Sequence, residues 1–514
     1  MPADAYCALN VNLVLSADRT EASLIIQIRC LIVNRRQVRH RGEYHAGSSR
    51  SLRCEPFPMK VMQASNIAAG EIASAPRRSE LTSRRSTQEL LVQACFAFGL
   101  IFLFPAFTIQ LAFDETTMTF TGSKALQMIN LGCEVFAFAL VLRSRTAISL
   151  TRQCRAILVL VAMAFIWVPF SYDPRTTVRA ANVFLSTSLF GIAMVARLGE
   201  LGSLRLIIRT MVLGCALSYY WVLAYPFEAV HQEFDAFQFQ HAGLWRGIFS
   251  HKQGLGVFAG LTFGLLLFYG STAFTSSFVL RLAALAIALR CLIGTKSATG
   301  ILVAAITPAT LYASYWFTLG APDMRKITIG LLPTTGSLVL GGFMFGAFDW
   351  VPEMLGKSSD MSGRTDIWPR VLENLMHTSA AFLGGGFGTG FSTTLAPDYV
   401  SVDNGYIDKI TEFGLVGAPF IFIAFLSIFF GGLRLITTTS KKDAKINVFP
   451  FTIMFVLFFI NISESNLMYK HLATVLTAVA AAFIASARIE RMRTARSLAR
   501  MRMRTTGSGG EVGA

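Results

Sequence analysis

The sequence predicts an all-α polytopic membrane protein with about twelve transmembrane helices. Of its 514 residues, 53% are hydrophobic and only 15% are charged, and the mean hydropathy is +0.52. This composition is too apolar for a soluble chain of that length. Apolar stretches long enough to cross a hydrocarbon core of about 30 Å as helices follow one another along the chain.

The residues before the first apolar stretch form a segment of a different kind. Residues 1–86 contain no apolar run of spanning length and end in the basic cluster PRRSELTSRRS, which runs from Pro76 to Ser86. Basic residues beside a span stay on the cytoplasmic side of the membrane. We therefore expect residues 1–86 to be a disordered cytoplasmic extension.

Twelve apolar stretches account for the helical part of the prediction. We expect spans near residues 90–113, 124–142, 155–171, 177–196, 204–226, 253–271, 275–293, 297–319, 327–350, 413–435, 447–463 and 467–487. They divide the chain after the extension into four parts. These are residues 87–350 with spans one to nine and a polar loop at 227–252, a large polar loop at 351–412, residues 413–487 with spans ten to twelve, and a basic tail at 488–514.

Basic residues recur in every second loop between these spans. The loops around 143–155, 197–209, 325–326 and 434–445 are rich in Lys and Arg, and the intervening loops are poorer in them or carry acids. The positive-inside rule therefore places both termini in the cytoplasm and the loops at 227–252 and 351–412 on the outer face. The net charge of +16 is explained in this way without a nucleic-acid partner, since no basic patch alternates with aromatic residues.

No cofactor-binding pattern occurs in the sequence, and we expect neither a metal nor a nucleotide cofactor. The eight cysteines are scattered without a CxxC pair, and none lies in the large loop. A disulfide framework or a metal knuckle is therefore not indicated. The GTKS stretch at Gly294 lacks the order of a Walker A motif, and His251 has no second metal ligand close by in the sequence.

Cationic residues gather in the two outer loops. Arg246 and Lys252 lie in the first, Arg364 lies in the second, and Arg179 stands at the outer end of the fourth span. Arginines bind phosphate oxygens bidentately at any relevant pH, so such a group could hold a diphosphate without a metal. The structural alternatives are that Arg364 pairs with Asp366 as a helix begins, and that Arg246 and Lys252 are anchors at the membrane interface.

The same loops contain a candidate general base and a glycine run. Asp403 could accept the proton of an acceptor hydroxyl, and Asp403 or Asn404 could instead cap the following helix. The run GGGFGTG, which includes Gly386 and Gly388, could bring backbone amides to a phosphate or be a flexible turn. The residues themselves leave these alternatives open.

Four of these stretches carry a family likeness. RGIFSHKQGLG, SGRTDIW, GGGFGTG and DNGYIDKITEFGLVG occur in this order and are separated by apolar spans. Over about residues 90–488 the chain thus resembles the O-antigen ligase and polymerase superfamily of bacterial envelope glycosyltransferases, and within it the exopolysaccharide-production polymerases. The resemblance implies a GT-C type glycosyltransferase of the bacterial inner membrane with a periplasmic active site. It also implies glycans on undecaprenyl diphosphate as donor and acceptor, and a chain-length regulator as a possible partner.

The resemblance assigns roles to particular residues. Arg246 and Arg364 match family arginines that bind the diphosphate, and Arg179 lies where another outer-face arginine is usual. Family members commonly carry His-Asn-Gly-Tyr where this chain has Asp403-Asn404-Gly405-Tyr406. The base is therefore Asp403, His251 or another carboxylate, while Asn404, Gly386 and Gly388 support the loop.

Three functions follow from this site and remain to be separated. The first is a polymerase that joins lipid-linked repeat units into a surface polysaccharide. The second is a ligase that moves finished glycan onto a lipid A core or a protein. The third is a transporter or flippase for lipid-linked sugars, which the scarcity of ionisable residues within the spans disfavours; Arg281 is the notable exception.

Overall fold

The computed structural model describes residues 78–103, 113–114, 119–120, 124–233, 241–320, 364–397, 402–468 and 472–507. The extension up to residue 77, the span expected near 327–350 and residues 351–363 of the large loop lie outside these ranges. The described residues are almost entirely helical, and two strands of two residues each, β1 (Phe113–Asp114) and β2 (Thr119–Phe120), pair antiparallel.

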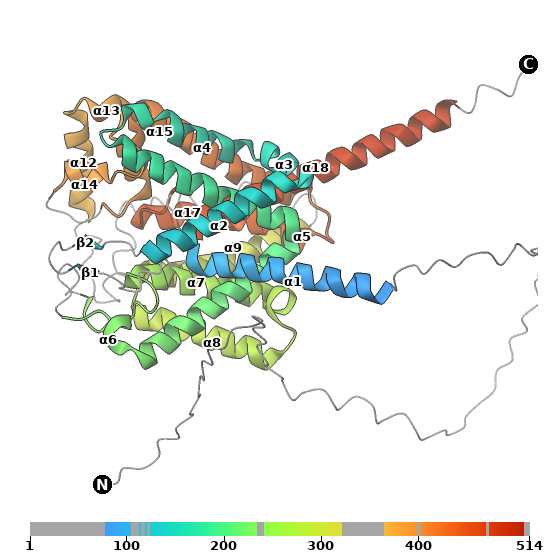
Figure 1. Cartoon of the computed structure of the whole chain (residues 1–514), viewed down its shortest axis with the longest axis horizontal. Helices are drawn as coiled ribbons and strands as arrows, with labels where there is room; N and C mark the ends of the chain where they lie inside the picture. Colours follow the sequence, from blue (N-terminus) through green and yellow to red (C-terminus); the bar gives the residue numbers. More distant parts are fainter. Residues whose placement is uncertain are drawn as a thin grey trace, which may run out of the picture. The chain divides into compact units, whose positions relative to one another are not determined.

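The first part of the chain forms a bundle of long helices (Figure 1). Its elements are α1 (Arg78–Leu103), α2 (Lys124–Arg143), α3 (Arg145–Gln153), α4 (Arg155–Ile166), the 3-10 helix η1 (Val168–Phe170), α5 (Pro174–Ala224), α6 (Pro226–Ala229), α7 (Lys252–Tyr269), the π-helical turn η3 (Gly270–Phe274), α8 (Phe278–Thr295) and α9 (Ala298–Leu319).

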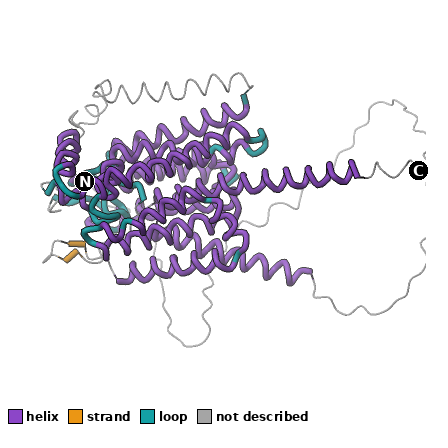
Figure 2. Tube along the Cα trace, turned by 90° about the horizontal axis from the view of Figure 1, so that it is seen from above, coloured by secondary structure: helices purple, strands orange, loops and turns teal. Residues whose placement is uncertain are grey.

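The second part adds short helices and then three long ones. They are α12 (Arg364–Met376), α13 (Ala380–Leu383), α14 (Phe391–Leu395), α15 (Gly405–Thr438), α16 (Ala444–Asn447), α17 (Phe449–Ser463) and α18 (Leu472–Gly507). The short helices α12, α13 and α14 lie at one end of the bundle, and α18 extends beyond the opposite end (Figures 1 and 2).

Seven helices in the described ranges are long and apolar enough to cross a membrane, or eight if the bent pair formed by α3 and α4 counts as one span. The chain is therefore an all-α, multi-pass membrane protein. Large apolar side chains on the outside of the bundle fit this environment; Phe278, Val279 and Trp316 are each about 70% exposed.

The expected count of twelve spans is not confirmed, and one reason lies in α5. This helix contains 51 residues and covers both spans expected at 177–196 and 204–226. A straight helix of that length would measure about 75 Å, more than twice a hydrocarbon core. Gly199 breaks it with a left-handed φ of 70°, a conformation that glycine adopts readily.

The helix α1 begins earlier than the sequence predicted. It starts at Arg78, within the extension expected to be disordered up to residue 86. Residues 78–89 contain neither proline nor glycine, so nothing in the backbone stops the helix before the apolar stretch begins. Residues 78–86, which the sequence assigned to the extension, are therefore part of α1.

Small residues allow α7 and α9 to pack closely against each other. A Cβ atom on Gly260 would stand 2.2 Å from the carbonyl oxygen of Gly300, and one on Gly300 would stand 2.6 Å from the backbone of Gly256. These glycines let the two backbones touch, as small residues do in membrane helices. The apolar half of α18 is buried almost completely among the other helices.

Candidate functional site

Three histidines converge beside the start of α7. The backbone of Val230 forms an antiparallel bridge with Trp245. The N–H of His231 donates to the carbonyl of Leu244 at 2.9 Å, and that of Gly243 donates to the carbonyl of His231 at 2.8 Å. This short pairing folds the segment back on itself, so His231, His241 and His251 come together although ten residues separate each from the next.

The three imidazole rings contact one another edge to face. Their centroids are 5.1–5.7 Å apart. The Nε2 of His231 accepts a hydrogen bond from the backbone N–H of Lys252 at 3.2 Å, and the Nδ1 of His251 accepts one from that of Gln253 at 3.2 Å. His251 is therefore the N-cap of α7, and its neutral ring carries the proton on Nε2.

Burial lowers the pKa of His251 from its ordinary 6.5 to about 3. The neighbouring His241, His231 and Lys252 lower the pKa further, and Asp403 opposes them. A histidine with this pKa is neutral at physiological pH and is a weak base. Together with its tautomer, this makes the Nε2–H of His251 a hydrogen-bond donor.

The turn before α15 holds Asp403 in a strained conformation. Asp403 has a φ of +45°, which non-glycine residues rarely adopt. The next residue, Asn404, caps α15 because its Oδ1 accepts from the N–H groups of Tyr406 and Ile407 at 3.0 and 3.1 Å. Its Nδ2 donates to the carbonyl of Ile462 at 3.2 Å, which ties the turn to the end of α17. The capping alternative is thus confirmed for Asn404.

A cavity of about 270 Å³ opens beside this turn, and we call it the open cavity. Its polar part contains Ser250, Gln253, Asp403, Glu464, Ser465 and Asn466. Its apolar part is formed by side chains of α7, α17 and α18, among them Val257, Leu261, Leu457, Ile460 and Leu476. The Oγ of Ser465 is buried and has no hydrogen-bond partner among the described residues. The open cavity is therefore amphipathic, with a carboxylate-bearing side and an apolar wall.

The cationic residues predicted from the sequence do not line the open cavity. Arg246 is buried, and its Nε donates to the carbonyl of Glu228 at 2.8 Å. Lys252 is buried too and lies next to the histidines. Arg179 is exposed on α5, and Arg364 is the first described residue of α12, with its side chain outside the described residues.

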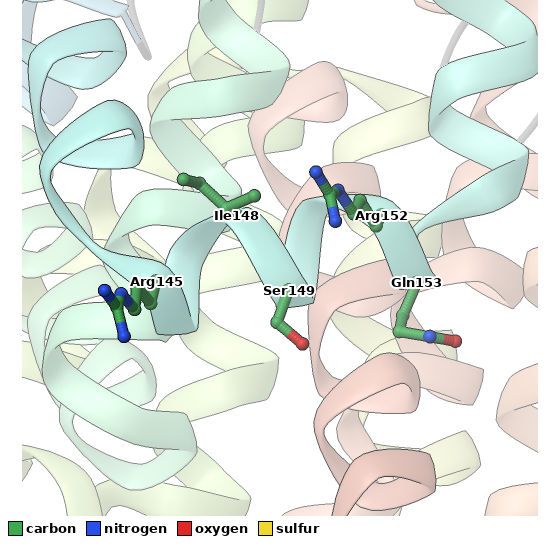
Figure 3. A pocket seen from close by; sticks show the side chains of 5 residues that line it. All are labelled: Arg145, Ile148, Ser149, Arg152 and Gln153. Atoms are coloured by element: carbon green, nitrogen blue, oxygen red, sulfur yellow. The ribbon is translucent and has the colours of Figure 1, made fainter.

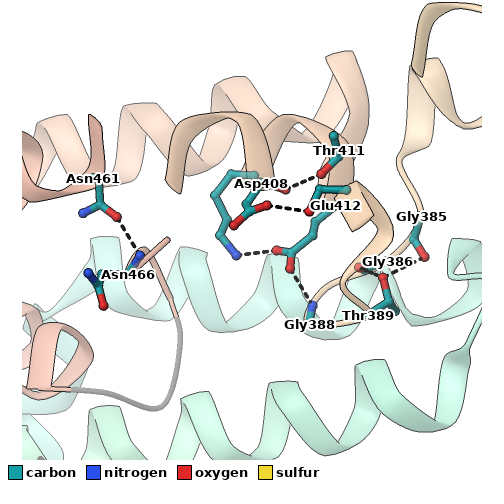
Figure 4. Close-up of polar contacts among 11 residues, drawn as sticks. Gly385, Gly386, Gly388, Thr389, Asp408, Thr411, Glu412, Asn461 and Asn466 are labelled. Carbon is teal, nitrogen blue, oxygen red and sulfur yellow. Dashed lines mark hydrogen bonds and ion pairs between the residues drawn. The ribbon is translucent and has the colours of Figure 1, made fainter. Parts of the chain in front are cut away.

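A second polar group at the same end of the bundle surrounds Glu412 (Figure 4), and we call Gly386, Gly388, Lys409 and Glu412 the closed cluster. Lys409 and Glu412 form an ion pair and are at most 1% exposed. The N–H of Gly388 donates to Glu412 Oε1 at 3.0 Å, and that of Gly386 donates to the Glu412 carbonyl at 3.0 Å. These two amides are bonded to the protein's own glutamate and in this structure do not face an open phosphate-binding site.

Packing explains why glycines are needed in the closed cluster. Gly386 and Gly388 have φ values of +104° and +73°. A Cβ on Gly386 would stand 2.0 Å from the Oγ of Ser171, and one on Gly388 would stand 2.4 Å from the Cβ of Ala180. The ammonium of Lys409 lies 5.0 Å from the centre of the Phe387 ring, at cation–π distance. The loop thus holds α15 against the start of α5.

No group of three or more His, Cys, Asp or Glu side chains is arranged to hold a metal ion in the described ranges. No protein-family model matches this chain, and no curated protein matches its sequence.

Sequence reasoning missed three of the groups found here. His231, His241 and His251 follow one another at intervals of ten residues. Among only seven histidines in the chain, this regular spacing was a signal that the three could form one group. Glu464 was noted only as part of an acidic loop. Glu464 lines the same cavity as Asp403 because hydrogen bonds join the turn before α15 to the end of α17. No local sequence pattern predicts these contacts.

Proposed function

We propose that this protein is a membrane glycosyltransferase that polymerises glycan repeat units carried on undecaprenyl diphosphate. In this proposal it is a GT-C type enzyme of the bacterial inner membrane with about twelve spans, and its active site faces the periplasm. The observation that carries the proposal is the open cavity, in which Asp403 and Glu464 stand at the polar side and apolar residues of α7, α17 and α18 form the wall. Such a cavity suits a substrate with a polar sugar and an apolar chain.

Asp403 is the general base of the proposed reaction. It lies at the polar side of the cavity beside His251, and a carboxylate takes a proton readily from a positioned hydroxyl. His251 is the poorer candidate because its pKa is about 3 and its Nδ1 already accepts a hydrogen bond. We assign His251 the role of donor that orients the acceptor sugar or Asp403.

The proposed transfer can be written as a direct displacement that needs no metal ion. Asp403 takes the proton of the acceptor hydroxyl, and the acceptor oxygen attacks the anomeric carbon of the donor. The bond between that carbon and the diphosphate breaks, and undecaprenyl diphosphate leaves with the electron pair. We assign the stabilisation of the leaving group's negative charge to Arg364, because Arg246, Lys252 and Arg179 do not line the open cavity.

A reconstituted assay tests this proposal. The full chain in liposomes receives undecaprenyl diphosphate oligosaccharide in the presence of a chelator, and the products are separated by size. We expect longer lipid-linked glycan from the native protein, and its loss with Asp403→Asn or Arg364→Ala. Glu490→Gln, an exposed change on the far part of α18, is the matched control and should retain activity.

Other products would overturn the proposal. Transfer to an added lipid A core without chain growth would identify a ligase. Movement of the lipid-linked sugar between leaflets without any new bond would identify a flippase.

A further inference from the structure

A second cavity lies between α4, α15 and α18, away from the open cavity. Its volume is about 370 Å³, and we call it the lipid groove. Its wall is apolar and includes Val159, Phe420, Ile423 and Ile484. Phe420 and Ile423 are 53% and 60% exposed on the outside of the bundle, where the hydrocarbon chains of the membrane lie.

Two arginines lie at one end of this groove. Arg155 is the first residue of α4, and Arg488 lies on α18 four residues after the buried helix stretch that ends near Ile484. The terminal nitrogen of Arg488 is 3.8 Å from the point where a Cβ on Gly431 would stand. On α15 the lining runs from Phe420 to Ile428, a length of about 12 Å, so the arginines lie at the Gly431 end of the groove.

The charged residues that line the groove are both basic, since no Asp or Glu lines it. The acid Glu200 interacts with Glu490 and Asp443 near Ser486 on α18, outside this lining. The neighbouring helix α3 adds Arg145 and Arg152, which border a shallow hollow together with Gln153 (Figure 3). Gln153 also lines the groove. Because α3 is bent from α4 by 78°, it lies across the helix end and carries its arginines beside Arg155.

We propose that the lipid groove binds an anionic glycerophospholipid. The phosphate lies between Arg155 and Arg488, and one acyl chain lies along the apolar wall toward Phe420. Two arginines in a groove that no Asp or Glu lines favour a lipid with net negative charge over a zwitterionic one, whose cationic headgroup would meet repulsion. The exposed apolar wall favours a lipid over a free phosphate ester, which would leave that surface uncovered.

Lipid binding to the purified full chain in detergent tests this inference. Native mass spectrometry is used to titrate phosphatidylglycerol and, separately, phosphatidylcholine. We expect one phosphatidylglycerol to be retained with clearly higher affinity than phosphatidylcholine. Arg155→Gln and Arg488→Gln should each weaken phosphatidylglycerol binding roughly tenfold, the loss of one charge-assisted contact. Arg500→Gln, an exposed change on the part of α18 beyond the groove, is the matched control and should leave binding unchanged.

A second variant tests the acyl-chain part of the groove. Ser427 lines the groove and is exposed, so Ser427→Phe should fill it and reduce phosphatidylglycerol binding while the melting temperature without lipid stays near that of the native protein. Glycerol phosphate at the same concentration should not compete. Equal binding of both lipids, unchanged binding by the two arginine variants, or competition by glycerol phosphate would each overturn the proposal.

Discussion

The closed cluster and the open cavity lie at the same end of the molecule and differ in how their polar groups are satisfied. In the closed cluster, Glu412 is bonded to Lys409 and to the N–H of Gly388, and the ion pair is at most 1% exposed. In the open cavity, Asp403 stands at a positive φ beside about 270 Å³ of space. A buried polar group that is fully bonded holds a fold together, whereas a carboxylate at a positive φ costs stability, and Asp403 lines a cavity that a substrate could enter.

The two groups also differ in the roles that the sequence suggested for them. The glycine run, expected to support the loop, is part of the closed cluster. The DNGY stretch contains Asp403, the candidate base, which lines the open cavity. The following experiments separate a stability role for the first from an activity role for the second.

The largest loss of stability should follow from breaking the buried ion pair. Lys409→Met leaves the Glu412 carboxylate buried without its cation, which costs about 3–5 kcal/mol. Thermal unfolding in detergent measures this as a lower melting temperature. The double variant Lys409→Met with Glu412→Leu should be less destabilised than the sum of the two single changes, because each single change leaves one charge unpaired. Additive effects would contradict the account of the pair.

A smaller loss is expected from a methyl group in the glycine loop. Gly386→Ala combines a φ of +104° with a Cβ only 2.0 Å from Ser171 Oγ, and we expect a cost of about 2–4 kcal/mol from strain and overpacking. Gly199→Ala is a matched control, since Gly199 has a φ of +70° but no atom within 4 Å of its added Cβ. It should cost about 1–3 kcal/mol from backbone strain alone, because a φ of 70° with a ψ of 178° is a region that side-chain-bearing residues avoid. Equal melting temperatures for the two variants would refute the role of close packing.

Removal of the cap of α15 should have a more modest effect. Asn404→Ala leaves the N–H groups of Tyr406 and Ile407 without their side-chain acceptor and should cost about 0.5–2 kcal/mol. Asn404→Ser, which restores a capping oxygen, should recover most of the lost melting temperature. If it recovers none, the contact from Nδ2 to Ile462 is the more important one.

A further effect concerns pH. The folded protein keeps His251 neutral down to a pKa of about 3, while the unfolded chain binds a proton there near 6.5. Between these values the unfolded state binds more protons, so stability should fall as the pH is lowered from about 6.5. His251→Gln should make the melting temperature less dependent on pH between 7 and 4.5. His377→Gln, a change at an exposed residue after α12, should not alter that dependence.

Much of the bundle was predictable because the length and apolar composition of a single segment decide whether it can cross a membrane. The apolar stretches of α7, α8, α9, α15, α17 and α18 appear in the sequence as runs of spanning length, and the N-cap at Asn404 follows from residue type and position. The count of spans is not confirmed, although the break at Gly199 divides α5 between the two spans expected at 177–196 and 204–226.

The site was predictable only in part, because it depends on contacts between distant segments. Asp403 and His251 were both singled out from the sequence, and the structure brings them into electrostatic contact. The i,i+3 spacing of Lys409 and Glu412 was visible, but their burial results from the fold of the glycine run around them. The approach of residues 402–405 to residues 461–466 joins parts of the chain almost sixty residues apart and has no local signal.

The most direct test of the central claim is to measure activity and stability together for Asp403→Gly. Glycine accepts the positive φ at this position, so the melting temperature should stay the same or rise by the relief of about 1 kcal/mol of strain. The rate of glycan extension in liposomes should fall by about 10²–10⁴-fold, the usual contribution of a general base. A variant that keeps its activity, or one that loses activity only because it unfolds, would contradict the assignment of Asp403 to catalysis.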